Sequence, residues 1–268
     1  MTFSIVAFDP ATGQHGVAVQ SCAFAVGVAV PWAEPGVGAV ATQANTNIHF
    51  GPEGLRLLKD GLSPAEVLSQ VTESDEGRKI RQVAAVDAQG HVAHYTGANC
   101  LAWAGAVSGE HFSCQGNILA GPEVVEAMAS AFTKTSGNLA ERLLAALAAG
   151  QEAGGDIRGV QSAALLVVSP EATHHPGGRL VDLRVDDHHS PIEELQRIYQ
   201  VRKKLWTRWQ ADWVEYSGDL VLVVEQIMHR RGIPSLQKLA EALGVPDGIR
   251  GSKISQKLIA AINDERRK

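Results

Sequence analysis

The sequence predicts an α+β protein: a four-layer αββα sandwich followed by a small C-terminal three-helix domain. Over residues 1–205 the predicted elements run as strands, two helices, strands, two helices and strands, which is not the βαβ alternation of a parallel sheet. Two antiparallel sheets packed face to face, with helices outside each, accommodate that order. Residues 206–268 form a linker and a helical domain, and 268 residues suffice for one large and one small domain.

The first third of the chain supplies three strands and two helices. The predicted strands cover residues 2–9, 16–21 and 37–42, and the predicted helices cover 51–59 and 63–71. The first two strands contain β-branched and aromatic residues, and the turn residues 10–13 join them as a hairpin. A turn-rich break at 31–36 precedes the third strand, whose small residues indicate close packing. Ser63, Pro64 and Glu66 are typical of a helix start.

The middle of the chain repeats this pattern. The predicted strands cover 81–86, 91–95, 102–107 and 111–114, the predicted helices cover 122–132 and 139–149, and two further strands cover 162–168 and 180–185. Turn residues at 87–90 join the first two of these strands as a hairpin. The run at 162–168 is continuously apolar, which is typical of a strand covered on both faces.

The last third of the chain changes character. Apolar residues at helical spacing predict a helix over 191–204. Trp206, Trp209 and Trp213 follow, and such a cluster serves either as a sugar-stacking platform or as apolar packing at a domain junction. We favour packing, because it is the commoner role of clustered tryptophans.

The tail forms a small helical module from about residue 212. Glycines separate three short predicted helices, at 219–229, 236–243 and 253–262. The chain has no aromatic residue from 217 to 268, and sugar recognition usually needs a stacking ring. We therefore expect the module to pack against the sandwich or a second subunit, through Leu220, Val223, Val224 and Ile227.

Composition argues against several classes of function. The net charge of -5 and the low aromatic content of 5% give no basic footprint for nucleic acid. No apolar run approaches the roughly 20 residues of a membrane span, and no secretory signal follows Met1. Cys22, Cys100 and Cys114 are widely spaced, which is typical of reduced thiols. We therefore expect a cytoplasmic protein that binds neither nucleic acid nor a membrane. We also expect the protein to be a homo-oligomer.

The sequence indicates neither a metal site nor a cofactor. His174-His175 and His188-His189 are adjacent pairs, and neighbouring side chains on a strand or loop point apart. No third ligand follows at helical spacing, so we interpret these histidines as solvated loop residues. No GxxxxGK[ST] is present, and no GxGxxG opens a helix after a strand, so nucleotide binding has no support.

Several separated motifs resemble one family. They are Thr2–Ala7, Gly16–Val19, Gly36–Gln43, Gln115–Glu123, Ala153–Ala164 and Val181–Asp187. These segments resemble the family known as domain of unknown function 1028, over about residues 1–205. That family looks like the N-terminal-nucleophile hydrolase fold, whose αββα layers agree with the element order above. Residues 216–251 are similar to small peptidoglycan-binding-like three-helix domains.

The resemblance implies a nucleophile at the first mature residue. Removal of Met1, which a small second residue permits, leaves Thr2 with a hydroxyl beside a free α-amine. An α-amine has an unperturbed pKa of roughly 7.7–8.0, so part of it is neutral at pH 7 and can accept the hydroxyl proton. Alternatively, Thr2 is an ordinary strand residue. If Met1 is retained, Ser21 or Thr42 becomes the hydroxyl to test and a non-catalytic role is favoured.

The resemblance also implies supporting residues around Thr2. Gln20 and Ser21 at the end of the second strand would support the nucleophile. The turn after the third strand usually supplies oxyanion donors, and Asn45 is its best amide. A polar loop, Gln115-Gly116-Asn117, would close the far side of the site. Alternatively, Asn45 and Asn117 cap the helices that follow them.

A late loop completes the implied site. Asp156 lies where proteasome-like relatives carry an aspartate, and Arg158 is two residues further on. Such relatives also carry a lysine on the third strand, whereas residues 37–42 contain none, so Arg158 is the cation proposed in its place. Alternatively, Asp156 and Arg158 form a simple loop ion pair.

Together these features predict an amidohydrolase that cleaves a C–N amide bond of a small molecule or peptide fragment through Thr2. Peptidoglycan fragments are a weaker substrate hypothesis. The alternative is a catalytically inactive αββα protein that serves in binding or as a scaffold.

Overall fold

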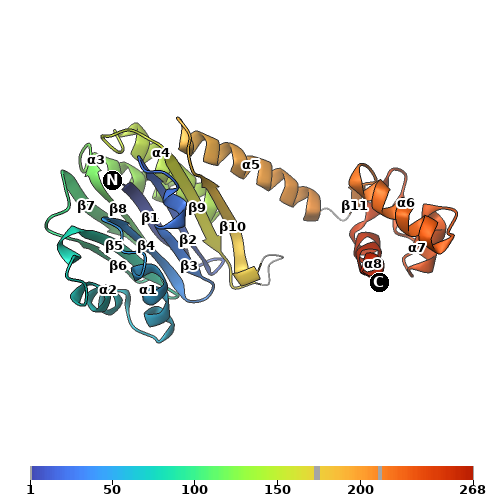
Figure 1. The fold of residues 1–268 in the computed structure, drawn as a ribbon, viewed down its shortest axis with the longest axis horizontal. Helices are drawn as coiled ribbons and strands as arrows, with labels where there is room; N and C mark the ends of the chain where they lie inside the picture. The colour runs from blue at the N-terminus through green and yellow to red at the C-terminus, as the bar shows by residue number, and fades with distance from the viewer. Residues whose placement is uncertain (1, 172–175, 211–212, 268) are drawn as a thin grey trace. The chain divides into compact units, whose positions relative to one another are not determined.

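A computed structural model describes residues 2–171, 176–210 and 213–267, with the side chains of 176 and 206–210 excepted. Its contacts divide the chain into two units, Met1–Tyr199 and Gln200–Lys268. The division falls within helix α5 (Pro191–Gln210), and the boundary predicted after residue 205 lies in the same helix. Figure 1 labels the elements of both units.

The first unit contains two antiparallel sheets (Figure 1). The larger has the strand order β10-β9-β2-β1-β8-β7, so the first strand of the chain is central, and the smaller has the order β3-β4-β5-β6. The larger sheet consists of β1 (Thr2–Asp9), β2 (Gln14–Ser21), β7 (Trp103–Gly109), β8 (Phe112–Leu119), β9 (Ser162–Val168) and β10 (Arg179–Val185). The smaller consists of β3 (Pro31–Glu34), β4 (Gly38–Ala44), β5 (Arg81–Asp87) and β6 (Val92–Thr96).

Helices cover the outer faces of both sheets. The helices are α1 (Phe50–Lys59), α2 (Pro64–Glu73), α3 (Glu123–Lys134) and α4 (Leu139–Glu152), with 3-10 turns at Val26–Val28, Arg78–Ile80 and Pro176–Gly178. One apolar core joins α3 and α4 to the larger sheet, and another joins α1 and α2 to the smaller. Ser63 and Asn138 begin α2 and α4 with capping boxes, which satisfy backbone N–H groups that the helix itself leaves unpaired. The mixed α+β class predicted from the sequence is therefore confirmed.

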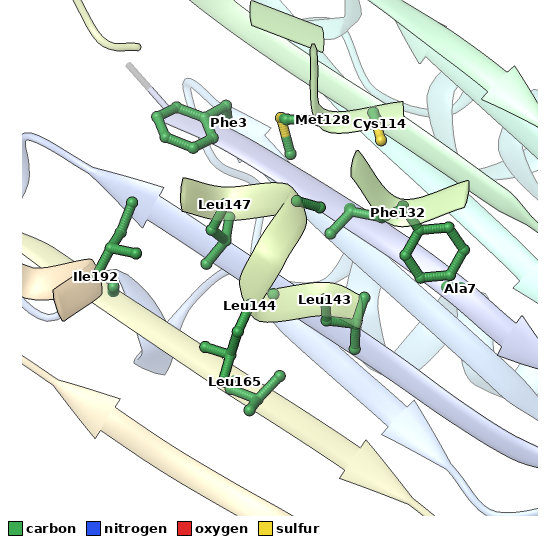
Figure 2. Packing of buried hydrophobic residues seen from close by; sticks show 14 of the residues in the cluster. Phe3, Ala7, Cys114, Met128, Phe132, Leu143, Leu144, Leu147, Leu165 and Ile192 are labelled. Atoms are coloured by element: carbon green, nitrogen blue, oxygen red, sulfur yellow. The ribbon is translucent and has the colours of Figure 1, made fainter. Parts of the chain in front are cut away.

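One face of β1 lies against the helices. Phe3, Ile5 and Ala7 are fully buried in the core beneath α3 and α4. Figure 2 shows Phe3 in this cluster with Met128 of α3 and Leu147 of α4. Because side chains alternate across a strand, the even-numbered residues of β1 point the other way, toward the smaller sheet.

The space between the two sheets is apolar at one end and polar at the other. Val6 and Phe8 pack in an apolar cluster with residues of β2, β4 and β5. Toward the start of β1 the same face carries Thr2 and Ser4, both buried. Buried polar groups need hydrogen-bond partners, so this end of the space must contain a polar network.

Two local predictions were wrong. Residues 31–34, predicted as part of a turn, form β3, which pairs with β4 alone. An edge strand tolerates Pro31 because one side of its backbone needs no partner. Residues 115–117, predicted as a loop, belong to β8, which continues to Leu119.

The second unit combines helices with a small sheet. Its elements are β11 (Trp213–Glu215), α6 (Asp219–Arg231), α7 (Leu236–Ala242), β12 (Ile249–Arg250), β13 (Lys253–Ser255) and α8 (Gln256–Arg266). The sheet was not predicted, and residues 253–255 are a strand, not the first turn of the last helix. Ser255 then begins α8, its side chain accepting a hydrogen bond from the Leu258 N–H.

Apolar residues of α6 face the core of their own unit. Val224 and Ile227 are buried in a cluster with residues of α7, α8 and β13, and Leu220 and Val223 pack against it. This corrects the expectation for Val224 and Ile227, whose side chains are buried within their own unit, whereas contact of Leu220 and Val223 with a partner stays a prediction. The Arg250 guanidinium lies 4.2 Å from the centroid of the Trp213 ring, which is therefore occupied in packing.

Two features fall partly outside what the structure describes. The side chains of Trp206 and Trp209 are not described, and His174 and His175 lie outside the described residues. None of the helices in the described ranges combines the length and the apolar character that a membrane span requires.

Candidate functional site

Thr2 begins the central strand of the larger sheet. It pairs with Ser21 of β2 on one side and with Asn117 of β8 on the other. Residues directly opposite each other in a sheet project from the same face, with Cβ atoms about 4.5–5.5 Å apart. The three side chains therefore form a row that faces the smaller sheet, and Thr2 is only 5% exposed.

Both the hydroxyl and the carbonyl of Thr2 have polar partners. The Oγ1 atom of Thr2 lies 3.1 Å from the Ser21 Oγ, and either hydroxyl can donate. The carbonyl oxygen accepts from the Gln43 Nε2 at 3.3 Å and from the Asn117 Nδ2 at 3.4 Å. These contacts bring three predicted site residues together and hold the backbone beside the hydroxyl.

Gln82 of β5 joins these amides to each other. Its Oε1 accepts from the Gln43 Nε2 at 2.8 Å and from the Asn117 Nδ2 at 3.0 Å. Its Nε2 donates to the Gly116 carbonyl oxygen at 2.8 Å and lies 3.2 Å from that of Gly105. The backbone carbonyls can only accept, so they determine the orientation of the Gln82 amide.

A second chain of hydrogen bonds reaches Gln43 from Ser4. The Gln115 Nε2 donates to the Ser4 Oγ at 2.7 Å, and the Ser4 hydroxyl donates to the Gln43 Oε1 at 2.6 Å. All three side chains are fully buried. The Gln115 Oε1 has no partner among the described residues, so this chain is incompletely satisfied, but its two hydrogen bonds orient the Gln43 amide beside Thr2.

Asn45 follows β4 and is held by Arg81. The Arg81 Nη1 donates to the Asn45 carbonyl oxygen at 2.6 Å and to its Oδ1 at 2.8 Å. Arg81 also binds Asp75, Nε to Oδ2 at 2.7 Å, and this hydrogen bond lowers the pKa of the Asp75 carboxyl. Asn45 does not cap a helix, because α1 begins after His49.

Asn45 and Asn117 line one pocket of about 340 Å³. Its walls include Asn99, Cys100 and Leu101, together with residues of β4 and β8. Burial raises the pKa of the Cys100 thiol, which argues against an activated cysteine nucleophile there. Thr2 is not among the residues that line this pocket, but Asn117 both lines it and is the direct neighbour of Thr2 in the sheet.

The loop that carries Asp156 joins the strands on both sides of Thr2. Asp156 forms an antiparallel bridge with Leu119 at the end of β8. Its Oδ2 accepts from the backbone N–H of Cys22, the residue after Ser21, at 3.1 Å. The Arg158 N–H donates to the Oδ1 at 2.9 Å, and the Arg158 Nη2 lies 3.3 Å from the Oδ2. Asp156 and Arg158 therefore form an ion pair, which lies beyond the start of β1.

Two residues considered with Thr2 point elsewhere. Gln20 lies on the face of β2 opposite to Ser21, and neither of its side-chain polar atoms has a partner among the described residues. Thr42 lies on the outer face of β4, where its hydroxyl donates to the Asn47 carbonyl oxygen at 3.0 Å. Alternation along a strand separates both from the row that contains Thr2.

The sequence reasoning missed three network residues. They are Ser4, Gln43 and Gln82, whereas Gln115 was expected beside the site as part of a loop. Each is a polar residue whose side chain points between the two sheets. A buried polar residue is a stronger indication of a functional site than a buried apolar residue is. Counting alternate positions from Thr2 and from Ala39 would have found Ser4 and Gln43.

Candidate metal ligands do not gather in the described part of the chain. No group of three or more His, Cys, Asp or Glu side chains there could hold a metal ion. The rings of His188 and His189 stack on each other, with centroids 4.3 Å apart. We therefore derive no chemistry from a metal.

The fold and the site define a mixed α+β protein of antiparallel sheets with a buried polar row at the start of its central strand. The chain belongs to the family of unknown function DUF1028, whose model matches residues 2–195. The resemblance stated from the sequence motifs is confirmed at the level of this family. A comparison with curated proteins found no match.

Two solved structures are similar to this chain. The crystal structure of protein SPO2555 from Silicibacter pomeroyi, a DUF1028 protein, is 35% identical, with a TM-score of 0.70. That similarity covers 82% of this chain and 88% of the other. Anbu, the ancestral beta-subunit, from Yersinia bercovieri is 9% identical with a TM-score of 0.35, over 78% of this chain and 97% of the other.

Proposed function

We propose that the protein is an amidohydrolase that cleaves a C–N amide bond of a small molecule or peptide fragment, with Thr2 as nucleophile after removal of Met1. The observation that carries this proposal is the environment of Thr2. Its hydroxyl contacts the Ser21 hydroxyl, two side-chain amides hold its carbonyl, and its neighbour Asn117 lines a pocket. A nucleophile fixed in this way is oriented before the substrate arrives.

The chemistry needs only the groups of Thr2 and one oxyanion donor. The neutral α-amine accepts the proton of the Thr2 hydroxyl as the oxygen attacks the substrate carbonyl carbon. The Asn45 Nδ2 stabilises the oxyanion that forms. The C–N bond then breaks, and the leaving nitrogen takes the proton from the α-ammonium. Water hydrolyses the Thr2 ester by the same steps, releasing the acid and restoring the hydroxyl.

Asp156 supports this mechanism from the loop beyond β1. Its carboxylate is fully buried and bound by two backbone N–H groups and by Arg158. A buried carboxylate stabilises a positive charge near it, so it would stabilise the α-ammonium that forms during the attack. Arg158 balances the carboxylate and keeps the net charge of the loop low.

The layer order supports the finer assignment to the N-terminal-nucleophile hydrolase fold. Apolar cores lie between α3–α4 and the larger sheet, between the sheets, and between the smaller sheet and α1–α2. In this proposal the protein is a cytoplasmic homo-oligomer and the second unit is a peptidoglycan-binding-like domain. Peptidoglycan fragments are the weaker choice of substrate.

The processing of Met1 is the first test. Intact-mass spectrometry of the purified chain should show a mass lower by one methionine residue. Met1 retained on every molecule would contradict the mechanism and favour the inactive scaffold.

The activity is tested on a panel of N-acyl amino acids and muropeptides. Thr2→Ser should retain part of the activity found, and Thr2→Ala should abolish it. In a variant with one residue inserted before Thr2, the α-amine of Thr2 becomes a peptide amide. Once mass spectrometry shows that the extra residue is retained, this insertion should reduce activity as much as Thr2→Ala does. Full activity in that variant would exclude the α-amine as base.

A further inference from the structure

The pocket lined by Asn45 and Asn117 is uncharged and combines polar with apolar residues. Among the described residues that line it, none carries a charge, and three are the asparagines Asn45, Asn99 and Asn117. Ala44 and Ile118, also in its wall, have positive φ angles of 68° and 53°. Non-glycine residues rarely adopt this conformation, and the strain involved is typical of functional sites. Such a pocket fits a neutral group with its own donors and acceptors.

The orientation of the Asn117 amide is determined by the buried network. The Gln82 Nε2 donates to backbone carbonyls, so the Gln82 Oε1 is an acceptor. Its partner on Asn117 must therefore be the Nδ2, which also donates to the Thr2 carbonyl. Both Nδ2 hydrogens are used, and the polar atom that Asn117 can offer to a ligand is the acceptor Oδ1.

In the Asn45 amide the oxygen is the bound atom and the nitrogen is left for a ligand, the reverse of Asn117. Arg81 has only donors, so the atom of Asn45 that it binds must be the Oδ1. The polar atom that Asn45 can offer to a ligand is then the donor Nδ2. The same pocket therefore presents an acceptor from Asn117 and a donor from Asn45.

We propose that Asn117 and Asn45 together recognise a scissile amide group that carries an N–H. The substrate N–H donates to the Asn117 Oδ1, and its carbonyl oxygen accepts from the Asn45 Nδ2. This assignment rests on the proposed function in placing the scissile bond in the pocket. It narrows the substrate class to primary and secondary amides.

Esters, tertiary amides and carboxylates are disfavoured by the same contacts. An ester or a tertiary amide has no N–H and leaves the Asn117 Oδ1 unpaired on binding. A carboxylate places a second acceptor against that oxygen. Sites built to pair a substrate N–H discriminate strongly against analogues that lack it, because a desolvated acceptor stays unsatisfied.

The test measures binding, so that it does not depend on turnover. The full-length Thr2→Ala variant is titrated with N-methylbutanamide, N,N-dimethylbutanamide and methyl butanoate, followed by the side-chain NH2 signals of Asn45 and Asn117 in NMR spectra. The secondary amide should bind at least about 10-fold more tightly than the other two probes. Equal binding of the three probes overturns the proposal.

Two variants, each made in the Thr2→Ala background, assign the discrimination to Asn117. Asn117→Ala should reduce the preference for the secondary amide to about 2-fold or less. Asn99→Ala removes an amide from the same pocket and should keep the preference. The opposite pattern overturns the assignment, and if Asn117→Ala does not fold, the three-probe series in the parent variant still decides.

The outcome separates this inference from the proposed function. If the secondary amide binds more tightly than the other two probes but no amide in the panel is hydrolysed, the recognition of an amide N–H by Asn117 is supported and catalysis by Thr2 is contradicted. Hydrolysis of esters and tertiary amides as efficiently as secondary amides supports Thr2 catalysis and overturns the reading by Asn117.

Discussion

Asn117 lies directly opposite Thr2 in the β1–β8 ladder, and its Nδ2 donates to the Thr2 carbonyl oxygen over 3.4 Å. The contact places an amide from the middle of the chain beside its second residue. Gln82 holds that amide from the other sheet, so the start of β1 is tied to both sheets at once.

Replacing Gln82 with methionine should destabilise the protein strongly. The change leaves the Gly116 carbonyl without its donor and the amides of Gln43 and Asn117 without their shared acceptor. Each buried group left unpaired costs about 1–3 kcal/mol, so we expect a loss of about 3 kcal/mol or more in the free energy of unfolding. Urea titration measures it, with Gln70→Met on the exposed face of α2 as control. A loss below about 1 kcal/mol would show that water replaces the network.

Replacing Asn45 with alanine should slow turnover more than it weakens substrate binding. An oxyanion donor acts on charge that develops in the transition state, and losing one costs about 2.7–4 kcal/mol, or about 10²–10³ in kcat. Steady-state kinetics on whichever amide the panel identifies gives kcat and KM separately. Gln70→Ala serves as control. An effect on KM alone would assign Asn45 to ground-state binding.

Replacing Ala44 with glycine should stabilise the fold. Ala44 has φ 68°, a region that glycine enters without steric cost, so the change should add about 1 kcal/mol. Ala41 is the matched control, because it lies in the regular part of β4 and is fully buried. Ala41→Gly should therefore destabilise by about 1 kcal/mol or more. Thermal unfolding of both variants checks this, and a loss of stability in Ala44→Gly contradicts the expected relief of strain.

His15 should make the fold sensitive to mild acid. The imidazole is buried with its Nε2 3.1 Å from the Asp87 carbonyl oxygen, and burial lowers its pKa. An unfolded histidine binds a proton near pH 6.5, whereas the folded one resists until lower pH. Its contribution to stability is therefore complete above about pH 6.5 and is lost as the pH falls through the folded pKa.

The His15→Gln variant tests this contribution. Glutamine can still donate to Asp87 but does not titrate, so the variant should lose less stability between pH 7 and pH 5 than the parent protein. Urea titrations across that range give the slope. Identical slopes in the two proteins would show that His15 does not bind a proton on unfolding.

The full-length protein should not sediment with purified peptidoglycan sacculi. Trp213 is stacked by Arg250, and the tail from 217 to 268 contains no aromatic residue to hold a sugar ring. A sedimentation assay with the Arg250→Ala variant in parallel checks whether uncovering the Trp213 ring matters. Specific sedimentation of the unaltered chain would show that the peptidoglycan-binding-like resemblance extends to function.

The sequence by itself determined most of the elements of the first unit and the position of the candidate nucleophile. Local composition predicted the strands at 2–9 and 162–168, because β-branched and apolar residues favour strands wherever they are buried. Capping residues predicted the start of α2. The motifs indicated the family, and Ser21, Asn117 and Asp156 were expected around Thr2 before any contact was known.

Only the tertiary structure decided which of these residues meet, and with which partners. Strand register sets the face on which each side chain lies, so Ser21 joins Thr2 while Gln20 and Thr42 are turned away. Gln82 and Arg81 lie far along the chain from the amides they orient, and no local pattern encodes such pairing. The Asn117 amide is oriented by a hydrogen bond across the space between the sheets, which exists only once both sheets have packed. The Asn45 amide is oriented by Arg81, which the pairing of β4 with β5 brings beside it within the smaller sheet.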